Sequence, residues 1–309
     1  MITFTNQPMQ TILPLLQSKL QTSDSVIFSV LNPDLSEGYA GHKVEIENKN
    51  YLYRGYKAWS DLAELLKCKM LTPKEGEYPL VNLTFTKLKN DSFHTEVKSS
   101  EKYGIDSHFT LIQKMEEPAF LYYYNQALEN VKVENRQRIL NLGINRGDEF
   151  EVIKKRVDTK KYEKINSIGI DHSESAIAYA KDIFPENNVN FYTHDINNLD
   201  ELELGKFDLL ISIGTLQSPS INFKPFFMKL VQEYLTKDAA IILGFPNSRW
   251  IGGEMIYGAK VPNYVMSEMG HLFNDVIFCK KYLQQKKYRV TITGKQYIFL
   301  SATKIMHSM

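Results

Sequence analysis

A chain of 309 residues is long enough for one large domain or for two ordinary ones, each with its own core. Its 37 Lys and Arg nearly balance its 36 Asp and Glu, and a net charge of +1 argues against a general nucleic-acid binder. No apolar run approaches the roughly 18 residues that a membrane helix needs, and no signal-peptide pattern is visible, so we expect a soluble, cytoplasmic protein.

Apolar residues at helical spacing predict a helix over residues 6 to 21, which Pro14 would kink or shorten. Ser25 to Leu31 is predicted to form a strand, and the alternation from His42 to Tyr56 favours further β-structure. Ser60 is predicted to be the N-cap of a second helix. The apolar face expected of that helix consists of Leu62, Leu65, Leu66 and Met70.

Val81, Leu83 and Phe85 alternate with polar residues, which predicts a strand with one wet face, and Phe93 to Val97 would be its hairpin partner. Lys98 to Ile105 carries two serines, several charges and a glycine, and is the predicted linker. We therefore expect a small α+β accessory domain over residues 1–105 and a second domain over residues 106–309. The accessory domain would cap the substrate or mediate dimerisation, and it holds no recognisable catalytic set.

Pro118 to Val131 predicts a helix with one apolar face, on which the aromatic side chains are expected to belong to the core. Tyr122 lies off that face and is a candidate to line a pocket.

The stretch from Arg138 to Asp148 predicts a buried strand, a tight turn containing Gly143 and Gly147, and the start of a helix. That helix has acids in its first turn and bases in its last, as the helix dipole prefers. A turn of this kind lets a ligand approach the backbone, and the helix start offers free N–H groups. The pattern therefore indicates a site for a nucleotide-like ligand.

Strands and helices then alternate regularly, which predicts a parallel sheet with helices on both faces. The predicted strands cover residues 167–170, 189–192, 207–213 and 239–245, and the predicted helices cover residues 173–184, 225–235 and 271–285. Tyr288 to Thr293 and Gln296 to Ala302 are joined by a short turn at Gly294, so these last two strands must be antiparallel.

Cys68 and Cys279 lie alone in segments that are predicted to be helical, and we expect both to be buried packing residues. The seven histidines are scattered without the spacing of metal ligands, so no metal site is predicted.

These motifs, in this order, resemble those of the class I S-adenosylmethionine-dependent methyltransferases over about residues 117–303. The segment Asn141-Leu-Gly-Ile-Asn-Arg-Gly147 stands where that family has an acidic residue followed by Gly-x-Gly-x-Gly. The chain also resembles the family's second motif at residues 169–177, its third motif at residues 194–196 and its fourth motif at residues 207–214. The resemblance implies an α/β fold, a Rossmann-like three-layer sandwich whose mostly parallel seven-stranded sheet has an antiparallel last strand, plus the small N-terminal α+β domain.

The implied cofactor is S-adenosylmethionine, with S-adenosylhomocysteine as its product. By resemblance, Asp171 would accept both ribose hydroxyls, Asp195 would meet the adenine amino group, and the backbone of Ile196 would meet the ring. Helix capping by Asp171 and a strand-end turn at Asp195 are the local alternatives. The candidate cofactor-binding residues are Asn141, Gly143, Asn145, Gly147, Asp171, His172, Asp195, Ile196, Ile213 and Gly214.

The chain departs from the family pattern at two positions. Asn145 replaces the middle glycine, which is tolerable because Asn enters the left-handed backbone region readily. Asn141 replaces the first acid and supplies no negative charge to the ammonium group of the ligand. Either Asp148 or a water compensates, or the site has decayed.

The resemblance implies methyl transfer, in which alignment of an acceptor matters more than a dedicated base, so no catalytic residue is named. The segment after the fourth strand, Gly214-Thr-Leu-Gln217-Ser-Pro, lacks the Asn/Asp-Pro-Pro-Tyr/Phe signature of enzymes that methylate adenine or glutamine amides. A small molecule or peptide acceptor is favoured over tRNA by the neutral charge. The candidate acceptor-binding residues are Gln217, Arg249, Tyr122 and Tyr257.

Three alternatives stay open. One is a non-catalytic protein of the same fold that binds the cofactor or its product and acts through a partner, which Asn141 motivates. A tRNA methyltransferase is another, and a nicotinamide-dependent dehydrogenase is the third, because Gly143, Gly147 and Asp171 also suit that fingerprint.

Overall fold

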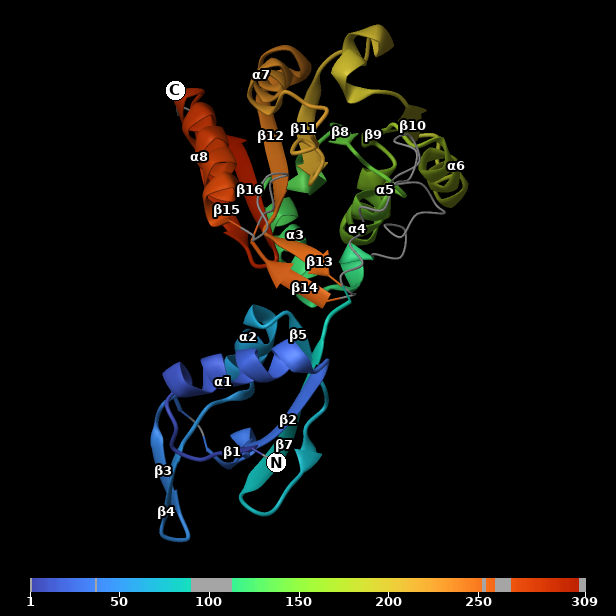
Figure 1. Cartoon of the computed structure of the whole chain (residues 1–309). Coiled ribbons are helices and arrows are strands. Elements are labelled where there is room, and N and C mark those ends of the chain that lie inside the picture. Colours follow the sequence, from blue (N-terminus) through green and yellow to red (C-terminus); the bar gives the residue numbers. More distant parts are fainter. Residues whose placement is uncertain (1, 37, 90–112, 252–253, 259–267, 306–309) are drawn as a thin grey trace. The chain divides into compact units, whose positions relative to one another are not determined.

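The computed structural model describes residues 2–36, 38–89, 113–251, 254–258 and 268–305, with the side chains of residues 249–251 left out (Figure 1). Two compact units make up the chain. Unit 1 comprises Met1–Ser92 and Trp250–Ile256, and unit 2 comprises Phe93–Arg249 and Tyr257–Met309.

Unit 1 is an α+β unit built on a five-stranded sheet. The strands of this sheet are β1 (Ile2–Phe4), β2 (Ser25–Leu31), β7 (Leu80–Lys87), β5 (Cys68–Met70) and β6 (Lys74–Glu75). Helices α1 (Met9–Thr22) and α2 (Tyr56–Leu65) share a core with them, and β3 (Lys43–Ile46) and β4 (Lys49–Leu52) form a separate hairpin. On β7, alternate residues Val81, Leu83 and Phe85 are buried, which confirms the predicted wet and dry faces.

The second predicted helix was misplaced. It begins at Tyr56 after its N-cap Gly55, not at Ser60, and it ends at Leu65. Lys67 then adopts the left-handed conformation with φ of 54°, which turns the chain into β5, so Cys68 and Met70 lie in a strand paired with β7. Apolar spacing over so short a segment fits a helix and a strand equally well.

Three other expectations in this region have mixed outcomes. Helix α1 runs through Pro14 to Thr22, so the proline does not end it early. The predicted hairpin partner at residues 93–97 and the linker at residues 98–105 lie outside the described residues.

Unit 2 contains the seven-stranded sheet that the sequence predicted, in the order β10-β9-β8-β11-β12-β16-β15. Its strands are β8 (Arg138–Leu142), β9 (Asn166–Asp171), β10 (Val189–Thr193), β11 (Phe207–Ile213), β12 (Leu235–Pro246), β15 (Tyr288–Gly294) and β16 (Tyr297–Lys304). The first five are parallel, while β16 runs antiparallel to both β12 and β15. The fold class and the reversed last strand are thereby confirmed.

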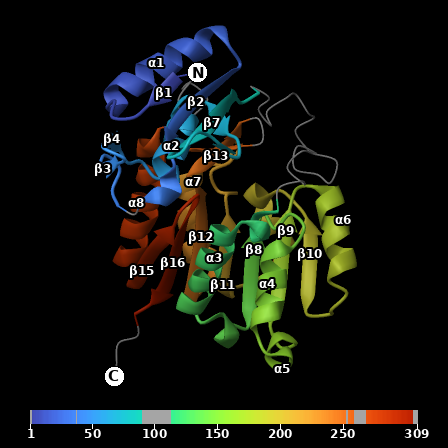
Figure 2. The same ribbon diagram turned by 90° about the horizontal axis from the view of Figure 1, so that it is seen from below.

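Two helical layers cover the sheet, because the central strands are apolar on both faces (Figure 2). One face, with Ile139, Ile211 and Ile242, packs against α3 (Pro118–Asn130), α4 (Asp148–Arg156) and α6 (Glu174–Ile183). The other face, with Leu140 and Leu243, packs against the helices that follow β11 and precede β15. Those are α7 (Phe223–Lys229), its continuation η6 (Leu230–Tyr234) and α8 (Met269–Gln285), while α5 (Thr159–Tyr162) is a single short turn.

The predicted helix over residues 225–235 is in fact α7 followed by a π-helical turn, and β12 then begins directly at Leu235, earlier than predicted. The segment after β12 forms the hairpin of β13 (Ser248–Ile251) and β14 (Glu254–Tyr257). In the described part of the chain, no helix is both long and apolar enough to span a bilayer.

Candidate functional site

The loop between β8 and α4 carries three residues in the left-handed backbone region. Gly143 has φ of 75°, Asn145 has φ of 48° and Gly147 has φ of 91°. The N–H of Gly143 donates to the carbonyl of Ile170 at 2.8 Å, which ties the loop to the end of β9. Glycine and asparagine are the residues that enter this region at least cost, so the sequence of the loop follows from its shape.

The two glycines are also required by packing. A Cβ on Gly143 would lie 1.8 Å from Oγ1 of Thr215, which follows β11, and a Cβ on Gly147 would lie 2.6 Å from Cε2 of Phe184. These distances are far below van der Waals contact, so no side chain fits at either position without displacing its neighbour.

Asp171, the last residue of β9, holds the loop from the other side. Its Oδ2 accepts the N–H of Asn145 at 2.9 Å, and its Oδ1 accepts the N–H of Ser173 at 3.1 Å. Nδ1 of His172 lies 3.3 Å from Oδ1, and the carboxylate is nearly buried. A carboxylate offers about four lone-pair sites, so these contacts leave acceptor capacity for hydroxyl groups.

The other candidate cofactor residues end neighbouring strands. Asp195 follows β10, is exposed, and caps a 3-10 helix (Ile196–Leu202) by accepting the N–H of Asn197 at 2.9 Å. Ile213 ends β11, and Gly214 behind it donates its N–H to the carbonyl of Gly244 at 2.9 Å. The carboxyl ends of parallel strands form one edge of a sheet, so all ten residues share the edge where α/β proteins hold their ligands.

Four buried amide atoms at this edge have no hydrogen-bond partner within the described residues. They are Nδ2 of Asn141, Oδ1 of Asn145, Oε1 of Gln217 and Oδ1 of Asn247. Asn141 is only 1% exposed, at the end of β8. Buried polar atoms are nearly always paired, so this group is ready to pair with a polar ligand.

Acidic side chains surround the start of α4. The pKa of Glu149 is raised from 4.5 to about 8, chiefly by burial and in part by the nearby carboxylates of Asp148 and Asp171. Burial also raises the pKa of Asp148, whose Oδ1 lies 3.7 Å from Nη2 of Arg146. Burial and mutual repulsion both disfavour the ionised form of a carboxyl, so this part of the edge favours a cation.

The candidate acceptor-binding residues are less closely grouped. Gln217 lies in the loop after β11, and the hydroxyl of Tyr257 accepts from Nε2 of Gln296 at 3.3 Å. Tyr122 is 64% exposed on α3, with its ring against that of Tyr123. Arg249 lies in β13, and its side chain is outside the described residues.

Three residues at this edge were missed by sequence reasoning. Thr215 fills the space beside Gly143, and Glu149 was interpreted only as a helix-dipole acid. The hydroxyl of Tyr297, on β16, would lie 3.1 Å from a Cβ on Gly214, and Nζ of Lys114 lies 5.4 Å from its ring centroid. Tyr297 and Gly214 are far apart in the chain, so only the strand order brings them together.

No cluster of three His, Cys, Asp or Glu side chains suited to a metal ion occurs among the residues that the structure describes.

A family model described as "Methyltransferase domain" matches residues 134–289, which include β8 to α8. No curated protein matches the sequence.

Solved structures with a similar arrangement include several methyltransferases. One from Aquifex aeolicus, described as SAM dependent, is 18% identical and has a TM-score of 0.44, covering 63% of this chain and 98% of its own. The magnesium protoporphyrin IX methyltransferase of Synechocystis PCC 6803, with bound SAH, is 14% identical with a TM-score of 0.41, covering 63% and 88%.

Coclaurine N-methyltransferase, bound to N-methylheliamine and SAH, is 17% identical with a TM-score of 0.35, covering 41% of this chain. The match spans only 36% of that protein. The family assignment comes from the family model, which covers half of the chain. The chain therefore belongs to the methyltransferase domain family, and residues 134–289 are its methyltransferase domain.

Proposed function

We propose that this domain binds S-adenosylmethionine at the carboxyl edge of the sheet and transfers its methyl group to a small molecule or a peptide. The observation that carries the proposal is the β8–α4 loop, which Asp171 holds in place by accepting the N–H of Asn145 at 2.9 Å. At the same edge lie buried amide atoms that have no hydrogen-bond partner among the described residues.

The residues present suit the chemical groups of this cofactor. Asp171 has acceptor capacity left for the two ribose hydroxyls, and Asp195 caps its helix through Oδ1, which leaves Oδ2 for the adenine amino group. The amide of Asn141 offers both a donor and an acceptor to the amino-acid part of the cofactor. The backbone of Gly143 and Gly147 permits close approach, and the remaining proposed contacts are Asn145, His172, Ile196, Ile213 and Gly214.

Charge supports the same assignment. Asn141 is neutral, but the cofactor carries positive charge on its sulfonium and ammonium groups. Asp148 and Asp171, together with Glu149 once it ionises, give this edge the negative potential that Asn141 does not supply.

The sulfonium makes the methyl group electrophilic when the cofactor is bound. What this chain contributes is alignment of the acceptor and exclusion of water, and such positioning alone can supply about 7–11 kcal/mol of barrier reduction. A dedicated base is not needed for this step, so we assign no catalytic residue.

The acceptor is inferred from polarity and charge. The amide of Gln217 and the hydroxyl of Tyr257 provide hydrogen-bonding groups beyond the ends of β11 and β12, and we propose that they contact the acceptor. A net charge of +1 favours a small molecule or a peptide over a polyanion such as tRNA.

Calorimetry with S-adenosylhomocysteine tests the site. Asp171→Ala should weaken binding about 100-fold, because it removes a two-hydroxyl acceptor and releases the loop, whereas Asp171→Asn keeps one acceptor oxygen and should lose less. Asp158→Ala is the matched control: Asp158 accepts the N–H of Lys160 at 3.1 Å as the N-cap of α5, so this variant loses a comparable cap away from the site. Unchanged affinity in both Asp171 variants would show that the cofactor binds elsewhere.

Labelled cofactor tests the acceptor. The protein is incubated with fractionated small molecules, peptides and RNA, and label should enter a small-molecule or peptide fraction. Label that enters RNA alone would replace our acceptor class with RNA.

A second candidate function is motivated by Asn141, which is buried and uncharged where the family has an acid. In that case the domain binds the cofactor or its product without turnover and acts through a partner. Tight product binding with no label in any fraction favours this candidate. If Asn141→Asp then restores methyl incorporation, the neutral residue is the cause of the inactivity.

A further inference from the structure

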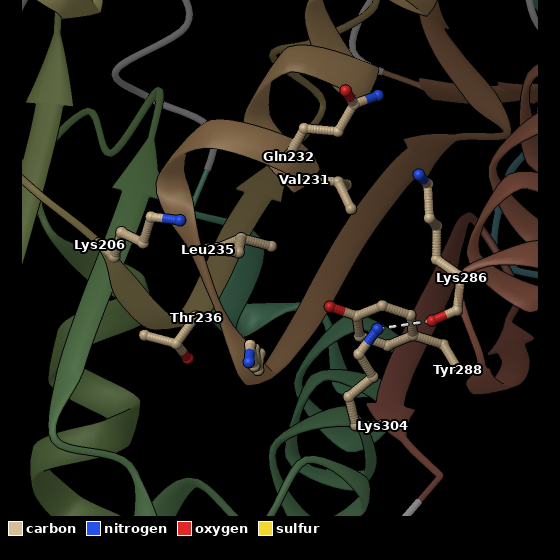
Figure 3. Close-up of a pocket in the computed structure, with 9 residues that line it drawn as sticks. Lys206, Val231, Gln232, Leu235, Thr236, Lys286, Tyr288 and Lys304 are labelled. Carbon is tan, nitrogen blue, oxygen red and sulfur yellow. Dashed lines mark hydrogen bonds between the residues drawn. The ribbon is translucent and has the colours of Figure 1, made fainter.

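A pocket of about 500 Å³ lies at the amino edge of the same sheet, opposite the proposed cofactor site (Figure 3). It opens where β11, β12 and β15 begin and β16 ends. Its lining residues are Lys206, Val231, Gln232, Leu235, Thr236, Lys237, Lys286, Tyr288 and Lys304. Because β11 runs from Phe207 to Ile213, the two edges are about 20 Å apart along the strand.

Among the described residues that line the pocket, four are lysines and none is acidic. Ion pairs elsewhere in the described residues occupy several lysines, for example Lys154 and Lys229, but none of those pairs includes a pocket lysine. The pocket therefore concentrates positive charge that no ion pair of the described residues neutralises. Asp238, next to Lys237 in the sequence, favours the charged form of Lys304.

Lys304 is held in position at the wall of the pocket. Its Nζ donates to the carbonyl of Lys286 at 2.5 Å and lies 4.3 Å from the ring centroid of Tyr288. Burial lowers the pKa of Lys304, and the charge of Lys286 lowers it further. Lys304 lies among other cations, so a bound anion would stabilise its charged form.

The side chains at the base of the pocket are buried or held by a hydrogen bond, and part of this base is apolar. Tyr288 is 3% exposed and Leu235 is 4% exposed. Gln232 is fixed because its Nε2 donates to the hydroxyl of Tyr282 at 2.8 Å. The four lysines therefore line a pocket whose base is fixed.

We propose that this pocket binds a small anion that carries several phosphate oxygens, such as pyrophosphate or the phosphate chain of a nucleotide. Lysine binds phosphate as a point charge, and four of them match more than one negative charge. The pocket has the size of a small-ligand site. The chain is nearly neutral overall, which argues against a basic surface large enough to bind nucleic acid. This anion site shares no residue with the proposed cofactor contacts, so a failure of one proposal does not affect the other.

Isothermal calorimetry of the full chain with inorganic pyrophosphate at 150 mM salt tests the proposal. The variant is Lys206→Ala with Lys237→Ala, two exposed lysines of the pocket. The matched control is Lys160→Ala with Lys161→Ala, two exposed lysines of α5 outside the pocket, which change the net charge equally. We expect one pyrophosphate per chain, binding at least tenfold weaker in the pocket variant, and unchanged binding in the control.

Separate titrations identify the source of the phosphate. Adenosine triphosphate and a single-stranded oligonucleotide are added to the same two variants. A nucleotide or pyrophosphate that binds more tightly than the oligonucleotide, with loss only in the pocket variant, supports a small anion. The proposal is overturned if wild-type protein binds no phosphate compound, if both variants lose affinity equally, or if only the oligonucleotide depends on the pocket lysines.

Discussion

The two edges of the seven-stranded sheet share their strands but differ in chemistry. At the carboxyl edge, backbone in the left-handed region, buried amides and the carboxylates of Asp148 and Asp171 favour a ligand with positive charge. At the amino edge, four lysines that are distant in the sequence or on different segments line a pocket that favours a ligand with negative charge. The net charge of +1 does not reveal this difference, because the opposite charges of the two edges nearly cancel in the total. Local charge therefore says more about ligands than the total does.

The largest expected effect comes from a substitution at the closely packed Gly143 of the carboxyl edge. Gly143→Ala places a Cβ 1.8 Å from Oγ1 of Thr215 in a left-handed backbone, and should cost about 3 kcal/mol or more of stability together with most cofactor affinity. Denaturant unfolding and calorimetry measure the two losses.

Gly205→Ala is the control for backbone strain alone, because Gly205 has φ of 71° and its nearest neighbour is the end of the Arg138 side chain at 3.4 Å. This variant should lose about 1 kcal/mol of stability and no cofactor affinity. Equal losses in both variants would mean that Thr215 does not restrict Gly143.

An intermediate effect concerns the acidic cluster. The pKa of Glu149 is raised from 4.5 to about 8, chiefly by burial, so the folded state keeps a proton that the unfolded state releases. This group therefore contributes stability that is fully present below pH 4.5 and is lost as pH rises towards 8.

Glu149→Gln removes that pH dependence. The variant should match wild type near pH 4 and exceed its stability by roughly 1–2 kcal/mol near pH 8.5, less than the full shift because the carboxyl is partly exposed. Thermal unfolding across this range measures the difference, and a constant difference at all pH values would show that Glu149 does not titrate as described.

The smallest expected effect lies at the amino edge and has the opposite sign. Lys206→Gln removes one of four like charges and should raise stability by about 0.3 kcal/mol at low salt, with no gain at 1 M salt. Denaturant unfolding at the two salt concentrations checks this. A loss of stability at low salt would mean that the lysines do not repel one another.

The sequence predicted more of the fold than of the two sites. Strands β8, β9 and β11 were predictable because they are buried on both faces and form apolar runs. The final hairpin followed from one short turn at Gly294. Helix α2 was misplaced because the turn at Lys67 has no clear signal in its residue type.

For the sites, the position of a residue at the end of a strand could be predicted. Contacts between residues that are distant in the sequence could not. Gly143 directly follows β8 and Asp171 is the last residue of β9, so their place at the edge follows from strand direction. Thr215, Tyr297 and the lysine pocket depend on strand order and on helix packing, which local residue patterns do not specify.

Hydrogen exchange of backbone amides with and without S-adenosylhomocysteine tests the central claim most directly, since it reports both edges of the sheet at once. Our account predicts slower exchange in residues 143–147 and at Ser173, and unchanged exchange in residues 231–237. Protection confined to residues 231–237, or no protection at the β8–α4 loop under saturating ligand, would contradict a cofactor site at the carboxyl edge.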